Sequence, residues 1–367
     1  MAAKPGFDVD FNQAPLLVIW EVTRACALAC QHCRASAIDF RDPDELSLDE
    51  GKKILDEIKA MGTPIVVFTG GDPLQRKDLE DLIRYGKSIG LRVGTIPAGT
   101  PRLDKARMLS LKESGVDQVA FSIDAPQAAD HDSFRQVPGS YDLTLQGARW
   151  AQELNIPLQV NTVFHKGNQH QIDELSELVA SLGIVFWEVF FLVPTGRGTQ
   201  LQGCSAEEME VIFAKLYELN KKVPFVIKVT EAQHYRRYIK QQQRLAGSPA
   251  QAHRHHVQEI NAKASHPHAI GRSSKVVNAG NGFLFIDHVG NICPSGFMPV
   301  VRGNVRQTSL AEIYKKDDFF VKLRDPSLLK GKCGRCEFKS TCGGSRSRAW
   351  AVHGDAWAEE PFCVLER

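Results

Sequence analysis

Three cysteines near the start of the chain have the spacing of an iron–sulfur site. Cys26, Cys30 and Cys33 follow one another as C-x3-C-x2-C, so one short loop supplies three thiolates. Iron–sulfur sites that serve only electron transfer are usually closed by four cysteines. Three protein ligands would leave one iron of a cubane cluster open to bind a small molecule and pass it an electron. The spacing therefore predicts a catalytic cluster.

A second set of cysteines lies near the other end of the chain. Cys333 and Cys336 form a C-x2-C pair, and Cys342 and Cys363 follow it. Four thiolates can close a cubane cluster, and they could equally hold a zinc ion in tetrahedral geometry. Because the N-terminal triad is present, we favour a cluster. Cys293, further upstream, could be a spare ligand, a thiol near the substrate or a buried apolar residue.

A glycine-rich turn follows the second predicted strand. Its residues are Gly70, Gly71, Asp72 and Pro73. Two adjacent glycines expose backbone carbonyls and allow a ligand to approach the chain closely. An ordinary strand-to-helix turn would contain similar residues, so the turn predicts a ligand site mainly because it lies one βα unit after the triad.

Together, these motifs resemble those of the radical S-adenosylmethionine (SAM) superfamily. The triad resembles the loop that holds its [4Fe–4S] cluster, in which SAM takes the fourth site. The turn at residues 70–73 resembles the GGEP-type motif that holds the SAM amino group, with Asp72 in place of the commoner glutamate. The resemblance implies reductive cleavage of SAM to a 5′-deoxyadenosyl radical, which abstracts hydrogen from a bound substrate.

The resemblance also implies further contacts with SAM. Ser122 would contact the ribose and Arg135 the methionyl carboxylate, since a guanidinium can pair bidentately with a carboxylate. Alternatively, the two residues are a strand-end cap and a surface arginine. His32 stands where the superfamily usually has an aromatic residue, and we expect it to pack on the adenine. The remaining expected cofactor contacts are Asp124, Asn161 and Leu192.

The C-terminal region, residues 276–367, resembles a SPASM or twitch-type extension that carries an auxiliary [4Fe–4S] cluster. Its tail is similar to that of enzymes that modify tetrapyrrole side chains in the alternative haem pathway and for the haem of nitrite reductase. Peptide maturases of the pyrroloquinoline quinone type are close to this subgroup. Ser345 stands where the tetrapyrrole enzymes typically have a cysteine, so a peptide substrate stays open. An iron–sulfur redox sensor is the non-enzyme alternative.

Alternating strands and helices must position these residues. The pattern predicts an α/β fold, an open partial (β/α)6 TIM-type barrel, over residues 1–230, with the triad at the carboxyl ends of the strands. The predicted strands are 16–20, 64–68, 91–96, 118–123, 158–164 and 184–193, with a further strand at 224–229. The predicted helices are 47–61, 77–88, 103–114, 141–154, 172–182 and 205–220. A hairpin at 282–293 opens the C-terminal region.

Residues 231–275 interrupt the pattern and are rich in glutamine, arginine and histidine. We expect them to cover the barrel mouth. Together with Arg346 and Arg348 in the cluster loop, they would suit a substrate that carries carboxylates, such as a tetrapyrrole or an acidic peptide.

Composition excludes several other functions. The net charge is +2, with no basic stripe, which argues against nucleic acid as a partner. No apolar run reaches 18 residues and no secretion signal is visible, so we expect a soluble cytoplasmic protein with no membrane partner. In such a protein, nine cysteines with tight spacings favour clusters over disulfides. The resemblance adds a low-potential electron donor such as flavodoxin or ferredoxin.

Overall fold

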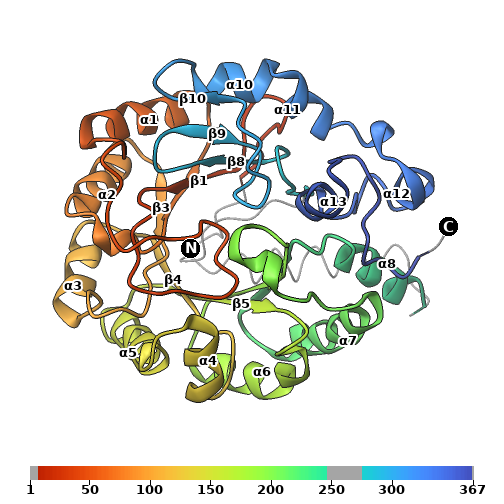
Figure 1. The fold of residues 1–367 in the computed structure, drawn as a ribbon, viewed down its shortest axis with the longest axis horizontal. Helices are drawn as coiled ribbons and strands as arrows, with labels where there is room; N and C mark the ends of the chain where they lie inside the picture. Colours follow the sequence, from red (N-terminus) through yellow and green to blue (C-terminus); the bar gives the residue numbers. More distant parts are fainter. Residues whose placement is uncertain (1–6, 246–274, 366–367) are drawn as a thin grey trace, which may run out of the picture.

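The structure is a computed structural model that describes residues 7–245 and 275–365. Within these ranges, strands and helices alternate around a partial barrel, with the helices in an outer ring (Figure 1). Most of the expected cover, including five of its six histidines, lies outside the described residues. The alternating strands are β1 (Leu17–Glu21), β2 (Ile65–Thr69), β3 (Arg92–Thr95), β4 (Gln118–Ser122), β5 (Leu158–Phe164), β6 (Phe186–Phe191) and β7 (Val226–Thr230).

The helices largely follow the sequence expectation. Ser47 and Ser205 both form capping boxes, in which each serine accepts a backbone N–H three residues ahead. Helix α4 was not predicted, because its short polar sequence lacks an apolar stripe. The helices of the barrel region are α1 (Leu48–Ala60), α2 (Leu79–Ser88), α3 (Lys105–Glu113), α4 (Ala128–Arg135), α5 (Ser140–Glu153), α6 (Ile172–Ser181), α7 (Ala206–Lys222) and α8 (Tyr235–Leu245).

The C-terminal hairpin extends the barrel sheet. Strand β8 (Phe283–Ile286) pairs in parallel with β1, and β9 (Asn291–Cys293) and β10 (Gly303–Asn304) follow in antiparallel order. The described strands therefore form one ten-stranded sheet, β10-β9-β8-β1-β2-β3-β4-β5-β6-β7. Without β8, one edge of the buried strand β1 would lack backbone partners. The later helices are α10 (Leu310–Lys316), α11 (Asp318–Leu323), α12 (Gly331–Arg335) and α13 (Arg346–His353).

A single large apolar core holds the barrel and the hairpin together. Trp20, Phe68 and Trp187 are fully buried in it, and Leu284 and Ile286 of β8 belong to the same cluster. Because the strands from β8 to β7 run in the same direction, their carboxyl ends meet at one end of the sheet. The loops that carry the expected site residues all start there.

Candidate active site and auxiliary pocket

The loop after β1 brings the three N-terminal thiols together, and each sulfur accepts a hydrogen bond. The Leu28 amide donates to Cys26 Sγ at 3.3 Å, and the Ala37 amide donates to Cys33 Sγ at 3.4 Å. The third donor is a side chain, because Arg135 Nη1 lies 3.6 Å from Cys30 Sγ. Donors around a sulfur stabilise its thiolate form. The three sulfurs therefore suit a bound group that needs thiolate ligands.

The two glycines of the turn after β2 pack against the triad loop. A Cβ on Gly70 would lie 2.5 Å from the Thr23 carbonyl oxygen, and one on Gly71 would lie 2.4 Å from that of Ala25. The Gly71 amide donates to the Thr23 carbonyl at 2.9 Å. Only glycine permits this approach, so the turn supports the backbone that presents the thiols.

Asp72 is held entirely by neighbouring residues. Its carboxylate accepts the Thr100 hydroxyl at 2.8 Å and the backbone amides of Leu74 and Ala98 at 3.2 and 3.3 Å. Burial raises the pKa of Asp72, and these hydrogen bonds oppose that effect. The carboxylate thus fixes the turn, and Pro73, buried beside it, begins a short 3₁₀ helix. Contact with SAM in this turn would fall to the backbone.

Arg135 is buried and forms an ion pair with Asp124. A carboxylate oxygen of Asp124 pairs with Arg135 Nη2, and the other accepts the Val163 amide at 2.9 Å. Burial alone would raise the pKa of Asp124, but the charge of Arg135 holds it below its usual value. The alternative of a surface arginine is therefore wrong. The guanidinium links the end of β4 to the sulfur of Cys30.

His32 lies in a stack of three rings. Its ring is 4.5 Å from that of Phe134, which is 4.6 Å from that of His165 on the other side. Burial lowers the pKa of His32 to about 3, so the ring is neutral near pH 7. Phe134 thus occupies one face of His32, and packing on an adenine would use the other face or the ring edge.

The remaining expected SAM contacts lie at the end of β4, in the middle of β5 and just after β6. Ser122 is opposite Asn161 in the register of β4 and β5. The Asn161 side-chain oxygen accepts Gln159 Nε2 at 2.7 Å. Leu192 follows β6 and is buried. Ser122 and Leu192 therefore lie at the end of the sheet that carries the triad loop, and Asn161 lies beside Ser122.

A segment after β6, residues 196–198, contacts the triad loop and was not predicted from the sequence. Arg197 donates from Nε to the Cys30 carbonyl at 2.9 Å and from Nη1 to the Ala37 carbonyl at 3.2 Å. Gly196 precedes it with a φ of +58°, and a Cβ there would lie 2.5 Å from the Cys33 carbonyl oxygen. The Gly-Arg-Gly run after a strand was the available signal, but its partner loop is far away in sequence.

The four C-terminal cysteines, Cys333, Cys336, Cys342 and Cys363, line one pocket. Three of the sulfurs accept backbone amides, from Glu360 at 3.2 Å, Phe338 at 3.4 Å and Gly344 at 3.4 Å. Two barrel residues, His234 and Arg237, line the same pocket. Nowhere in residues 7–245 and 275–365 do three His, Cys, Asp or Glu residues form a group that could hold a single metal ion. We call the pocket lined by the four C-terminal cysteines the auxiliary pocket.

Cys293 lies elsewhere. It ends β9, is 2% exposed, and does not line the auxiliary pocket. Burial raises the pKa of its thiol to about 12, with a further rise from Asp287. It is therefore a buried residue of the hairpin that does not share a pocket with the four C-terminal cysteines, and its role stays a prediction.

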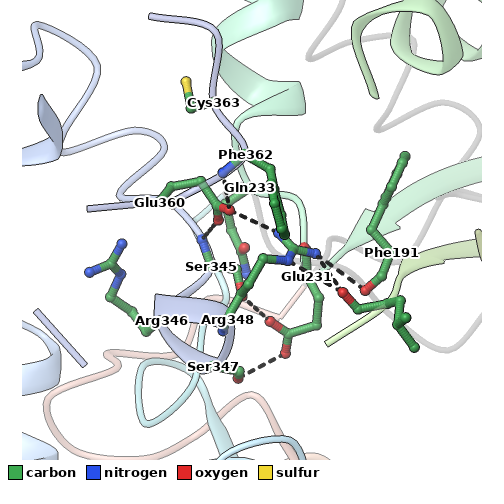
Figure 2. Close-up of polar contacts among 12 residues, drawn as sticks. Phe191, Glu231, Gln233, Ser345, Arg346, Ser347, Arg348, Glu360, Phe362 and Cys363 are labelled. Carbon is green, nitrogen blue, oxygen red and sulfur yellow. Dashed lines mark hydrogen bonds and ion pairs between the residues drawn. The ribbon is translucent and has the colours of Figure 1, made fainter. Parts of the chain in front are cut away.

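A buried ionic network joins the auxiliary pocket to the barrel (Figure 2). Arg348 of α13 is fully buried and pairs with Glu360 at 3.1 Å. The same guanidinium donates to the carbonyls of Phe191, Leu192 and Glu231 at the ends of β6 and β7. Arg348 therefore holds α13 against the carboxyl ends of two barrel strands.

The Glu231 carboxylate completes this network. It accepts the hydroxyls of Ser345 and Ser347, both on the α13 side. Burial raises the pKa of Glu231, whereas the charge of Arg348 keeps the pKa of Glu360 below its usual value despite burial. Ser345 thus has a structural partner in the barrel.

Two expected substrate contacts are corrected by this network. Arg348 is committed to Glu360 and to main-chain carbonyls, so it cannot also present its charge to a substrate carboxylate. Arg346 is buried, and its Nη1 donates to the carbonyls of Ala356 and Ala358 at 2.8 and 2.7 Å. The sequence could not show that both guanidiniums face inward.

Comparison with known proteins identifies the family. Residues 20–179 match the model of the radical SAM superfamily. The chain is 39% identical to the AdoMet-dependent heme synthase of Methanosarcina barkeri, over 97% of this chain and 98% of that protein. The chain belongs to the radical SAM superfamily. It is also 28% identical to the PqqA peptide cyclase of Rhodopseudomonas palustris, over 100% of this chain and 91% of that protein.

Solved structures of low sequence identity share the fold of this radical SAM protein. SuiB of Streptococcus suis, bound to S-adenosylmethionine, superposes with a TM-score of 0.72 at 16% identity, covering 96% of this chain and 78% of that one. Native anSMEcpe with bound AdoMet gives a TM-score of 0.68 at 14% identity, covering 95% and 93%. The predicted partial barrel is therefore confirmed, and no helix of the described residues has the length and apolar character of a membrane span.

Family membership makes this protein an enzyme and implies a [4Fe–4S] cluster and SAM as its cofactors. The triad loop fits such a cluster, because each of its three sulfurs has a hydrogen-bond donor and no cysteine of the chain is in a disulfide. Burial raises the pKa of the Cys26 thiol to about 12, so the bare thiol keeps its proton. Binding of positively charged iron would displace that proton.

Proposed function

We propose that this enzyme modifies a carboxylate-bearing side chain of a haem-type tetrapyrrole. The observation that carries the proposal is the 39% identity to an AdoMet-dependent heme synthase over nearly the full length of both chains. Two further heme synthases show 37% and 38% identity. A Fe-coproporphyrin III synthase and a pre-heme d1 synthase, at 28% and 29% identity, are also named for tetrapyrrole products.

Cys26, Cys30 and Cys33 would hold the catalytic [4Fe–4S] cluster. When bound, the cluster and SAM supply a 5′-deoxyadenosyl radical that abstracts hydrogen from the substrate. The chain's own contribution is to hold the loop and to keep water out. The turn at 70–73 and Arg197 both hydrogen-bond to the loop backbone, and Arg135 donates to the sulfur of Cys30.

SAM contacts remain part of the proposal. Backbone groups of Gly70 and Gly71 would contact SAM, together with the side chains of Ser122 and Asn161. Arg135 would contact the methionyl carboxylate with the part of its guanidinium that Asp124 leaves free, since its Nε has no partner among the described residues. Asp124 would then orient Arg135. His32 and Leu192 would border the adenine.

The auxiliary pocket would hold a second [4Fe–4S] cluster on Cys333, Cys336, Cys342 and Cys363. Support comes from the convergence of all four thiols, and the backbone donors to three of them, on one pocket. The four cysteines belong to the C-terminal region, residues 276–367, to which we assign a role distinct from that of the barrel of residues 1–230. His234 and Arg237, from the segment 231–275, complete the pocket wall. The cluster would exchange an electron with the substrate.

The reaction needs an external electron, for which we propose flavodoxin or ferredoxin as donor. We place the enzyme in the cytoplasm, where a reducing environment keeps its nine cysteines free. A peptide substrate is the second candidate, favoured by the 28% identity to a PqqA peptide cyclase across the whole chain.

The substrate class can be tested with the anaerobically reconstituted enzyme. Iron-coproporphyrin III is titrated in the presence of SAM and reductant while the Soret band and the yield of 5′-deoxyadenosine are followed. We expect a Soret shift and a rise in 5′-deoxyadenosine. An acidic precursor peptide serves as the comparison. Stimulation by the peptide alone would replace the tetrapyrrole by a peptide as the substrate.

A further inference from the structure

His234 is a buried polar side chain without a partner. It lies between β7 and α8, is fully buried, and neither ring nitrogen has a hydrogen-bond partner among the described residues. Buried polar groups in native proteins are almost always hydrogen-bonded, because an unpaired one costs its full desolvation free energy. A histidine retained in such a place therefore calls for a partner that a bound group would supply.

The position of His234 limits what that group can be. The residue lines the auxiliary pocket, whose wall also contains Cys333, Cys336, Cys342 and Cys363. On another side its ring meets the ring of Phe213 edge-on, at a centroid distance of 5.0 Å. With an apolar ring on that side, the pocket is where a polar partner can lie. A pocket lined by four thiols suits an iron–sulfur cluster or a thiolate-bound metal ion.

Two charged groups near His234 already form ion pairs, although Arg237 Nε has no hydrogen-bond partner among the described residues. Glu360 pairs with Arg348 and accepts the Ser345 amide at 2.7 Å. Arg237, the other barrel residue in the pocket wall, is paired with Glu210. His234 is therefore the side chain from the barrel whose hydrogen-bonding capacity is entirely unused in this wall.

A neutral imidazole carries one N–H donor and one lone pair. Cysteine thiolates and bridging sulfides of an iron–sulfur cluster are acceptors of hydrogen bonds, and such bonds change the reduction potential of the cluster. Four cysteines already complete the ligand set of a cubane cluster, so the lone pair of the ring is not needed as an iron ligand. The N–H group can therefore donate a hydrogen bond to the cluster.

We propose that His234 donates a hydrogen bond to a sulfur of the auxiliary cluster and raises its reduction potential. The proposal rests on the auxiliary cluster of the proposed function. His234 acts here as a positioning and tuning residue: the hydrogen bond favours the reduced cluster, which carries more negative charge. It also makes the barrel a direct partner of the cluster, through a residue that follows β7.

The test uses a full-length background in which Cys26, Cys30 and Cys33 are all alanine, so that only the auxiliary cluster binds. In this background, His234→Phe keeps a ring of similar shape without a donor, and His234→Gln keeps an N–H donor. Redox titration followed by electron paramagnetic resonance gives the potential. We expect His234→Phe to shift the potential to more negative values and His234→Gln to restore much of the difference.

His131→Phe is the matched control, because His131 is also a buried histidine of the barrel but does not line the auxiliary pocket. We expect it to leave the potential unchanged. The proposal would be overturned if the His234→Phe protein held its iron and its auxiliary cluster had the same reduction potential as in the triple-alanine background with His234 intact. Loss of iron from His234→Phe but not from His234→Gln would support a donor. Loss from both would overturn it, because it would make His234 an iron ligand or a structural residue.

The background protein itself separates the two proposals. If it binds no iron while the parent protein does, the auxiliary cluster of the proposed function is wrong. If it binds about four irons and the potential does not depend on His234, only the present inference fails.

Discussion

The two cysteine regions of this enzyme are built differently. Around the triad, three thiols come from one short loop, and glycines and arginines from elsewhere in the barrel brace its backbone. Around the auxiliary pocket, four thiols come from the more widely separated positions 333, 336, 342 and 363, and a buried ionic network fixes the segment to the barrel. The comparison suggests that an open iron needs a compact loop that leaves room for SAM, whereas a closed cluster tolerates dispersed ligands if the segment is anchored.

The largest expected effect separates the two regions by activity. We expect Cys30→Ala to abolish formation of 5′-deoxyadenosine, because the catalytic cluster loses one of its three ligands. Cys342→Ala should retain SAM cleavage while losing substrate conversion. Both products are measured by chromatography after anaerobic turnover. Cys204→Ala is the control, since Cys204 is buried and lies in neither region. Wild-type cleavage by Cys30→Ala would refute the assignment of the triad.

Iron content sharpens the same comparison. The reconstituted protein should hold about eight irons, and replacement of Cys26, Cys30 and Cys33 by alanine should leave about four. Replacement of Cys336 and Cys342 should remove the other half. Iron and zinc are measured together by plasma mass spectrometry. A triple variant with one zinc per chain and no iron would make the auxiliary pocket a structural zinc site.

The anchor of the C-terminal region is tested by Arg348→Met. Breaking a buried ion pair leaves an uncompensated charge, here on Glu360, and costs about 3–5 kcal/mol of stability. Arg244→Met is the control, because its pair with Glu337 is exposed and such pairs contribute about 0–1 kcal/mol. Urea denaturation of the reconstituted proteins gives both values. Equal small losses would show that Arg348 is not the anchor.

Arg135 tests the bracing of the triad region. Arg135→Ala should weaken SAM binding by about 2–4 kcal/mol, because a charged contact is lost and a carboxylate is left without its partner. Calorimetric titration with SAM under anaerobic conditions measures the change. Circular dichroism checks that the variant is folded, since Asp124 also loses its partner. Unchanged affinity would assign the SAM carboxylate to another cation.

The smallest expected effect concerns pH and the hairpin beside β1. His288 Nδ1 lies 2.9 Å from Oε1 of Glu21, which ends β1. Burial would lower the pKa of His288, but the hydrogen bond and charge of Glu21 raise it overall. Because the pKa of His288 is higher in the folded protein than in the unfolded one, the contact stabilises the protein. This stabilisation is fully present at pH values below the unfolded-state pKa of about 6.5. It is lost as the pH rises through the folded-state pKa.

We therefore expect His288→Gln to lower stability more at about pH 6 than at about pH 9. Glu21 stays ionised at both values, because burial is outweighed by Arg34 and His288, which lower its pKa. Urea denaturation at the two pH values measures the difference. A loss of stability that is independent of pH would mean that the contact does not depend on the charge of His288.

Much of the fold was predictable because its signals are local. Ser47 and Ser205 begin helices by bonding to amides three residues ahead, and apolar runs such as 64–68 give buried strands by composition alone. The exceptions were α4, whose polar sequence carries no apolar stripe, the short helices α11, α12 and α13 of the C-terminal region, and the pairing of β8 with β1. That pairing joins residues more than two hundred positions apart, which no local pattern encodes.

The sequence by itself determined which residues could hold clusters, because C-x3-C-x2-C and C-x2-C spacings place thiols on one short segment whatever surrounds it. Only the tertiary structure decided what those thiols meet. Arg135 turned inward to Asp124 and Cys30, Arg348 became an internal anchor, and His234 joined the auxiliary pocket. The physical reason is that burial and pairing of charges depend on packing between distant segments, and the desolvation of each group sets which partner it must have.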